Sequence, residues 1–268
     1  MWAYSFMQNA VMAGLIIATL CGMVSVFVVL RQASFSAHAL GHMSLTGAAG
    51  AALLGIPPLL GQLILNILAA ILLGLGGAKI RKNDLTVGVV LSFVLGLGAY
   101  FLFLFQNNYA GSVMSILFGN IFAVASNQIQ LLLGLGVVVI LVLLLILRPL
   151  IFASIDPIVA ASKNVKTRLL AVIFFCILAI TVSLACQVVG ALLVFVLLII
   201  PGAIGMQWGE TIVKILAISI ISANLAVILA LYLAYSCDLP ASFCITMLLC
   251  GFYVAGIAKG RCKTILRQ

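Results

Sequence analysis

Charged residues are scarce in this chain of 268 residues. Asp, Glu, Lys and Arg together make up 6% of it, and only four of these residues are acidic. A soluble domain contains about 25% charged residues, so this composition cannot cover an ordinary water-exposed surface. Hydrophobic residues make up 66% of the chain, and the mean hydropathy is +1.42. The composition predicts an all-α transmembrane helical bundle, because the apolar runs are much longer than the alternating strands of a membrane β-barrel.

Several motifs that would indicate an enzyme or a nucleotide site are missing. The phosphate-binding pattern G-x-x-x-x-G-K-[ST] does not occur, so any ATP hydrolysis that powers this protein is expected on another chain. The seven cysteines form no C-x-x-C pair and mostly lie in apolar runs, which favours packing over metal binding or disulfides. The first apolar run lacks a basic n-region and an A-x-A site, so no cleavable signal peptide is expected.

Long apolar runs follow one another along the chain and predict the membrane spans. They cover approximately residues 6–30, 34–55, 59–78, 85–105, 128–147, two runs within 169–205, 211–235 and 240–258. The stretch 169–205 is too long for a single span of about 20 residues, so we expect two spans with a turn near Gln187–Gly190. Residues 111–127 are shorter and more polar, and we expect them to form a re-entrant or interfacial helix.

Basic residues indicate how these spans are oriented. If the loop Lys79–Lys82 is cytoplasmic and the spans alternate, all 13 Lys and Arg residues fall on the inner side. This arrangement predicts about nine crossings, with the N-terminus outside and the C-terminus inside; eight crossings result if one short span is only re-entrant. The +9 net charge is therefore a topology signal and not a nucleic-acid-binding patch. We expect residues 1–268 to form a single transmembrane domain, with a cytoplasmic segment at about 153–168.

The only two histidines of the chain, His38 and His42, lie together in the second predicted span. Their spacing of four places both imidazoles on the same helix face, with about 5–6 Å between the Cβ atoms. Ionisable residues inside a membrane are costly, and they are first interpreted as functional. The alternative is that each imidazole hydrogen-bonds a carbonyl of a neighbouring helix. Two nitrogen donors on one face predict part of a transition-metal site, with moderate affinity if the ion must also leave.

Two other kinds of histidine chemistry are excluded. A zinc protease of the H-E-x-x-H type needs a glutamate as general base, but Ala39 occupies the glutamate position. A bis-histidine haem needs ligands on opposite faces of the haem, which one helix cannot supply at this spacing.

The segment 153–168 contains a helix-start pattern. Asp156 has the character of an N-cap and Pro157 of a first helical residue, which predicts a short amphipathic helix in the longest inner loop. Such a surface helix could dock into a partner, whereas an ordinary loop between spans is the alternative of equal weight.

Two further features interrupt the apolar runs. Pro201 and Gly202 could break a span and line a pathway, or could be a tolerated kink. Gln62 and Asn66 are four residues apart, and hydrogen bonding between helices is the favoured interpretation of this pair.

Several stretches taken together resemble the permease subunits of bacterial ABC importers for zinc, manganese and iron. The resemblance rests on V-F-V-V-L-R-Q-A-S-F-S-A-H-A-L-G-H-M-S-L-T-G (26–47), I-L-F-G-N-I-F-A-V (116–124), the Asp156 segment, G-A-L-L-V-F-V-L-L-I-I-P-G-A (190–203) and Y-L-A-Y-S-C-D-L-P (232–240). No single stretch is decisive, but the series covers nearly the whole chain in the order typical of that family.

The resemblance implies a set of partners and a location. It implies a homodimer, or a pair of related permeases, in the bacterial cytoplasmic membrane. It further implies two cytoplasmic ATPases and an extracytoplasmic metal-binding protein that delivers the ion. No permanently bound cofactor is implied, because the metal is the transported substrate. The residues that correspond to the family's coupling helix, which fits a groove of the ATPase, are Asp156, Pro157, Ile158, Ala160 and Ala161.

The chain departs from the family pattern at the histidine pair. Members usually read D-A-L-x-H-A-S-L-P-G in this span, but here His38 stands at the Asp position and Thr46 at the Pro position. An imidazole in place of a hard carboxylate should disfavour Mn²⁺ relative to Zn²⁺ or Fe²⁺. Metal affinity should also fall below about pH 6.5, because protonated imidazoles do not bind metal ions.

The sequence is thus interpreted as the membrane-spanning subunit of an ATP-driven divalent metal importer, in which His38 and His42 hold the ion transiently. One alternative is a non-transporting membrane scaffold or assembly subunit with the same fold. An exporter or channel that works alone is disfavoured by the coupling-helix-like segment.

Overall fold

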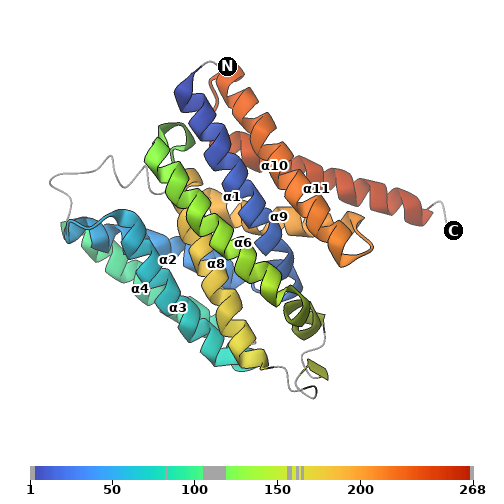
Figure 1. Cartoon of the computed structure of the whole chain (residues 1–268), viewed down its shortest axis with the longest axis horizontal. Helices are drawn as coiled ribbons and strands as arrows, with labels where there is room; N and C mark the ends of the chain where they lie inside the picture. Colours follow the sequence, from blue (N-terminus) through green and yellow to red (C-terminus); the bar gives the residue numbers. More distant parts are fainter. Residues whose placement is uncertain are drawn as a thin grey trace.

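The structure is a computed structural model that describes residues 4–81, 84–104, 119–155, 159–160, 163 and 166–265 (Figure 1). These residues form nine α-helices, one short 3₁₀-helix and no β-strand, which confirms the all-α prediction. The elements are α1 (Ser5–Leu30), α2 (Ser34–Leu53), α3 (Pro58–Arg81), α4 (Asp84–Leu104), η1 (Ile121–Ala123), α6 (Ser126–Ile155), α8 (Thr167–Val189), α9 (Ala191–Trp208), α10 (Ile212–Cys237) and α11 (Ala241–Ile265).

Each predicted span contains one α-helix, and eight of these helices are long and apolar enough to cross a membrane. The exception is α2, which contains both histidines and several serine and threonine residues. The described part of the chain therefore has the eight or nine spans that the sequence predicts. The count is eight if α2 is left out and nine if it is included. The protein is a multi-pass membrane protein.

Two prolines lie inside helices; Pro149 contradicts an expectation drawn from the sequence, whereas a helix that tolerates Pro201 was one of the two alternatives left open. α6 continues through Pro149 to Ile155, although its span was expected to end at Arg148, and α9 is continuous through Pro201. A proline removes only the hydrogen bond to the carbonyl four residues earlier, and neighbouring helices can compensate inside a membrane. At about 1.5 Å per residue, the 30 residues of α6 span about 45 Å, so this helix extends beyond the hydrocarbon core.

The short helix expected over 111–127 falls only partly within the described residues. Residues 111–118 lie outside them. The remainder forms an irregular stretch, the single turn of η1 and the start of α6, so no continuous helix covers this part.

Four helices in the described part of the chain end at a residue with positive φ: Gln32, Gly55, Gly190 and Asp238. After α1, Gln32 is left-handed with φ 53°, and the backbone N–H groups of Gln32 and Ala33 donate to the carbonyls of Val29 and Val28 at 3.1 and 2.9 Å. This is the Schellman pattern, with glutamine where glycine is usual. Gly190 has φ 85° and separates α8 from α9, which confirms the turn predicted near Gln187–Gly190.

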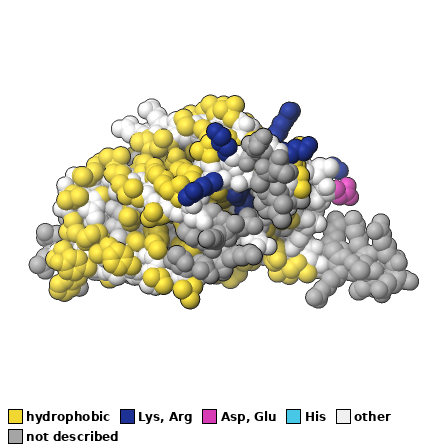
Figure 2. Space-filling model, turned by 90° about the horizontal axis from the view of Figure 1, so that it is seen from below, with side chains coloured by type: hydrophobic (Ala, Val, Ile, Leu, Met, Phe, Trp, Pro, Cys, Tyr) yellow, Lys and Arg dark blue, Asp and Glu magenta, His cyan; other side chains and the backbone are white. Residues whose placement is uncertain are grey.

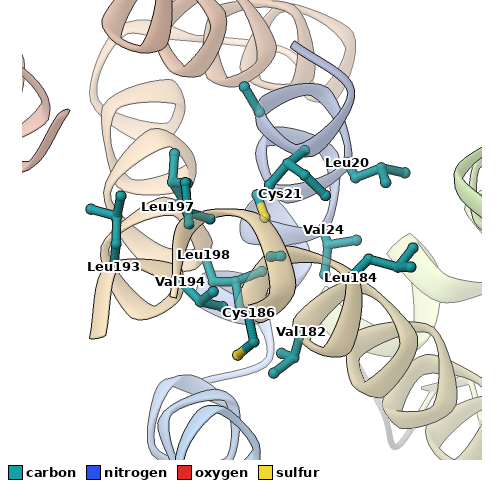
Figure 3. Close-up of a cluster of buried hydrophobic side chains, with 14 of the residues drawn as sticks. Leu20, Cys21, Val24, Val182, Leu184, Cys186, Leu193, Val194, Leu197 and Leu198 are labelled. Carbon is teal, nitrogen blue, oxygen red and sulfur yellow. The ribbon is translucent and has the colours of Figure 1, made fainter. Parts of the chain in front are cut away.

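The centre of the bundle is built from α1, α8 and α9. Of the eight apolar spans, α1 and α8 are the most buried. Figure 3 shows side chains from these three helices in one cluster, with no charged group among the labelled residues: Leu20, Cys21, Val24, Val182, Leu184, Cys186, Leu193, Val194, Leu197 and Leu198. Both cysteines are buried and form no disulfide, as expected for small apolar side chains.

α2 lies within a shell formed by other helices. It packs against α3, α4, α8 and α9, which lie around it in Figure 1. Ser44 and Thr46 are buried, and each hydroxyl finds a protein partner: Ser44 bonds the Leu40 carbonyl, and Thr46 bonds the Val94 carbonyl of α4. Neighbouring helices therefore separate Ser44 and Thr46 from lipid, which lets a helix of low hydropathy lie at membrane depth.

Basic side chains gather on one face of the molecule. Figure 2, which views the structure from below Figure 1, shows the described Lys and Arg side chains grouped beside apolar surface. The grouping agrees with the predicted topology, because these residues lie at helix ends that alternation places on one side of the membrane. They are Arg31, Arg148, Lys163, Lys166, Arg168 and Lys214.

α2 and α3 cross where two glycines meet. A Cβ atom placed on Gly61 would overlap the Gly47 carbonyl and the Ala51 side chain, so Gly61→Leu cannot be accommodated without separating the helices. We expect this substitution to destabilise the protein by about 1–3 kcal/mol, the usual cost of overpacking. Thermal unfolding of the detergent-purified protein measures the loss. Gly134→Leu on α6 is the matched control, because nothing lies within 4 Å of its Cβ position; equal melting temperatures for the two variants would contradict the close crossing.

Candidate metal-binding site on helix α2

The structure brings His38 and His42 together on one side of α2. Their ring centroids are 4.5 Å apart, and the ring planes are nearly perpendicular at 84°. A tetrahedral ion about 2.1 Å from one nitrogen of each ring would separate the centroids by roughly 5 Å. The observed separation is close to this value, so the two imidazoles are near enough to share one ion.

A third ring, that of Phe195 on α9, completes the immediate surroundings of His38. The two centroids are 4.7 Å apart, with 68° between the ring planes. The aromatic edge contact limits the orientations that the imidazole can adopt. Sequence reasoning did not identify Phe195, because one phenylalanine in a run of aliphatic residues gives no sign that it faces a histidine on another helix.

Both histidines lie at the margin between the buried and the open side of α2. Each imidazole is half-buried, and the same side of the helix carries Phe35, which is 37% exposed, and the half-buried Leu45. The opposite side is closed by neighbouring helices, with Leu40, Met43 and Ser44 fully or almost fully buried. The pair is neither sealed in the core nor turned fully outward, as expected for a site that an ion must enter and leave.

The described residues supply two ligands and not a complete coordination sphere. Among them, no group of three or more His, Cys, Asp or Glu side chains is placed to hold a metal ion. Two imidazoles suit a transition metal, but a structural zinc site has four ligands. A complete metal site at this pair would draw its further ligands from water, from another chain or from residues outside the described ranges.

Behind the histidines, a buried hydrogen-bond network joins three helices. The Asn66 amide on α3 donates to Ser44 Oγ on α2 at 2.7 Å and to Ser183 Oγ on α8 at 2.9 Å. This confirms the predicted hydrogen bonding between helices for Asn66. Its neighbour Gln62 is also buried, but its Oε1 has no hydrogen-bond partner in the part of the chain that the structure describes.

The other predicted site residues are placed only in part. Pro201 and Gly202 are buried in a continuous helix, and a Cβ on Gly202 would overlap the backbone of Ser25 on α1. Their role in a pathway stays a prediction. Of the coupling residues, Ala160 is buried, whereas Asp156, Pro157, Ile158 and Ala161 lie outside the described residues.

A cavity of about 320 Å³ lies away from the histidines. It is lined by the loop before α6, the turn between α8 and α9, and the turn between α10 and α11. Asn120 and Ser242 are its polar side chains, and no described charged residue lines it. The cavity therefore has no ligand set for a metal ion.

Known proteins are similar to this chain along almost its whole length. The ABC 3 transport family matches residues 3–260. The manganese import system permease protein ScaB of Streptococcus parasanguinis is 31% identical over 252 residues, which cover 94% of this chain and 89% of that protein. The chelated iron transport system membrane protein YfeD of Yersinia pestis is 28% identical over 266 residues, covering 98% of this chain and 89% of that protein.

A solved structure agrees with the sequence comparisons. PsaBC from Streptococcus pneumoniae, determined in complex with a Fab, superposes with a TM-score of 0.81 and 25% sequence identity, covering 94% of this chain and 91% of the matched chain. The fold and the sequence thus lead to the same group of bacterial membrane permeases, which confirms the resemblance drawn from the sequence. This multi-pass protein of the bacterial cytoplasmic membrane belongs to the ABC 3 transport family.

Proposed function

We propose that this chain is the membrane-spanning subunit of an ATP-driven importer of divalent metal ions, and that His38 and His42 hold the ion during passage. The observation that carries this proposal is the half-buried imidazole pair, whose ring centroids lie 4.5 Å apart on α2, the one described α-helix that is not apolar enough to count as a membrane span by itself. Permeases similar to this chain are named for manganese and iron import, which supports a metal ion as the cargo.

We propose that a second permease copy completes the site. One chain offers two imidazoles on a partly open helix side, and two chains related by a two-fold axis would offer four. A homodimer satisfies the ligand requirement most simply, and a related permease with the same pair would do so equally well.

The proposed energy source and the donor of the ion are separate proteins. The chain carries no phosphate-binding loop, so cytoplasmic ATPases would supply the energy through the segment 153–168, whose first residues continue α6. The basic face marks the cytoplasmic side, where such ATPases would bind. An extracytoplasmic metal-binding protein would deliver the ion on the opposite side. In this proposal the chain itself transports and does not catalyse a reaction.

Removal of either imidazole should impair uptake. We expect His38→Ala and His42→Ala each to reduce divalent metal uptake by about tenfold or more, because the ion loses one of its few ligands in a low-dielectric site. Uptake of ⁵⁴Mn, ⁵⁵Fe and ⁶⁵Zn in cells that lack other importers, normalised to the permease content of the membranes, measures the effect.

The matched control is Thr246→Ala, which removes a polar group from α11, a helix that is not among those packed closely against α2. Uptake at the wild-type level in both histidine variants would refute the ligand role.

The metal preference should change when the family's usual carboxylate is restored. We expect His38→Asp to shift selectivity towards Mn²⁺, because a hard oxygen donor and an added negative charge favour this ion over Zn²⁺. The measurement is the ratio of Mn²⁺ to Zn²⁺ uptake when the two ions compete. An unchanged ratio would show that residue 38 does not set the preference.

A further inference from the structure

Asn66 is the residue through which α3 and α8 hold the helix that carries the histidines. Its side chain is fully buried, and its two amide hydrogens go to serines on two different helices, Ser44 of α2 and Ser183 of α8. Each serine also donates to the carbonyl four residues earlier in its own helix, at 3.0 Å in α2 and 2.9 Å in α8. Both hydroxyls are therefore oriented as acceptors for Asn66.

The attachment point lies on the back of α2 relative to the metal site. Ser44 follows His42 by two residues. At about 100° per residue, the two side chains point about 160° apart around the helix. α8 makes a second contact on the same stretch, where Cys186 Sγ lies 3.9 Å from the Gly41 carbonyl. The two contacts, at Gly41 and Ser44, thus lie on either side of His42 in the sequence. They leave free the side of the helix that carries its imidazole.

Small rotations of α2 would matter for metal binding. An imidazole nitrogen lies about 6–7 Å from the helix axis, so a rotation of about 2° moves it by about 0.2 Å. That displacement equals the tolerance of metal–ligand distances, about 0.2 Å. Because both imidazoles lie on α2 and move together, such a rotation changes their position relative to the ligands proposed on a second permease copy. A hydrogen bond that fixes the rotation of α2 therefore affects the geometry of the whole proposed site, although it does not touch the ion.

We infer that Asn66 is a positioning residue for metal binding. It holds α2 in the rotation that presents His38 and His42 to the ion. This inference rests on the proposed function and adds to it a residue on another helix, outside the metal ligands. The link from Asn66 to Ser44 carries the effect, and the link to Ser183 anchors Asn66 to α8.

The test is the metal concentration that gives half-maximal uptake, measured separately from the maximal rate per permease molecule. Asn66→Leu removes both amide bonds but leaves the two serines bonded to their own helices, so no hydroxyl donor becomes unsatisfied. We expect the half-saturating concentration to rise about tenfold, in line with the loss of partners that orient metal ligands. The absorption spectrum of Co²⁺ bound to the purified permease should change as well, because the ligand geometry changes.

Three further variants separate positioning from general stability. Ser44→Ala cuts only the link to α2 and should reproduce the Asn66→Leu shift, and it also serves if Asn66→Leu fails to accumulate. Ser183→Ala keeps the Ser44 link and should shift the concentration less than about threefold. Asn224→Leu is the matched control: Asn224 bonds Thr19 between α10 and α1, so its loss should leave the half-saturating concentration unchanged.

A wild-type half-saturating concentration in both Asn66→Leu and Ser44→Ala would overturn the positioning role, as would an equal shift in Asn224→Leu. The histidine variants keep the two proposals distinct. If His42→Ala abolishes uptake while Asn66→Leu does not alter it, the positioning role alone fails. If His42→Ala transports normally, the metal site itself fails.

Discussion

A polar helix can lie at membrane depth only if protein, and not lipid, surrounds its polar groups. α2 is the one helix of this bundle whose hydropathy does not suit a lipid-facing span, since it carries two histidines together with Ser44 and Thr46. An unpaired polar group in hydrocarbon costs several kcal/mol, on the order of the whole stability of many domains. The packing of α3, α4, α8 and α9 around α2 follows from this constraint.

Close packing and hydrogen bonding contribute in different ways to that arrangement. Hydrogen bonds between helices inside membranes stabilise by only about 0.6 kcal/mol on average, so they do not hold the bundle together alone. Small residues allow the backbones to approach, as Gly47 and Gly61 do where α2 crosses α3. Hydrogen bonds then select one rotation and one register, with Asn66 for α2, and with the Ser25–Ser219 pair, 3.0 Å apart, for α1 and α10. Packing therefore supplies the stability, and the polar contacts supply the geometry.

Much of the fold follows from composition and apolar run length. Each predicted span contains one helix, and Gly190 ends α8 where the excessive length of the run 169–205 required a turn. The prolines were harder to interpret, because a helix whose neighbours compensate for one lost hydrogen bond continues through Pro149 and Pro201. Sequence spacing alone cannot show whether a neighbour is present.

The residues of the candidate site were also predictable only in part. The i, i+4 spacing placed His38 and His42 on one side of a helix, because that relation lies within one element. Phe195 lies more than 150 positions from His38, and Ser183 lies 117 positions from its partner Asn66, so both contacts depend on how helices pack. Asn66 could be recognised as a polar residue that needs a partner, but the identity of that partner could not be derived from spacing.

In the proposed dimer, a site that is incomplete on each chain would have a functional consequence. A carrier must bind its ion well enough to select it and weakly enough to release it, so a full set of four ligands on one rigid chain would hold the ion too firmly. Two imidazoles on each of two chains can form a sufficient site when the chains are close, and an insufficient one when they separate. In that proposal, release would require only a relative movement of the two bundles and no rearrangement within either. The attachment of α2 to α3 and α8 favours such a mechanism, because the histidines then move together with the rest of the bundle.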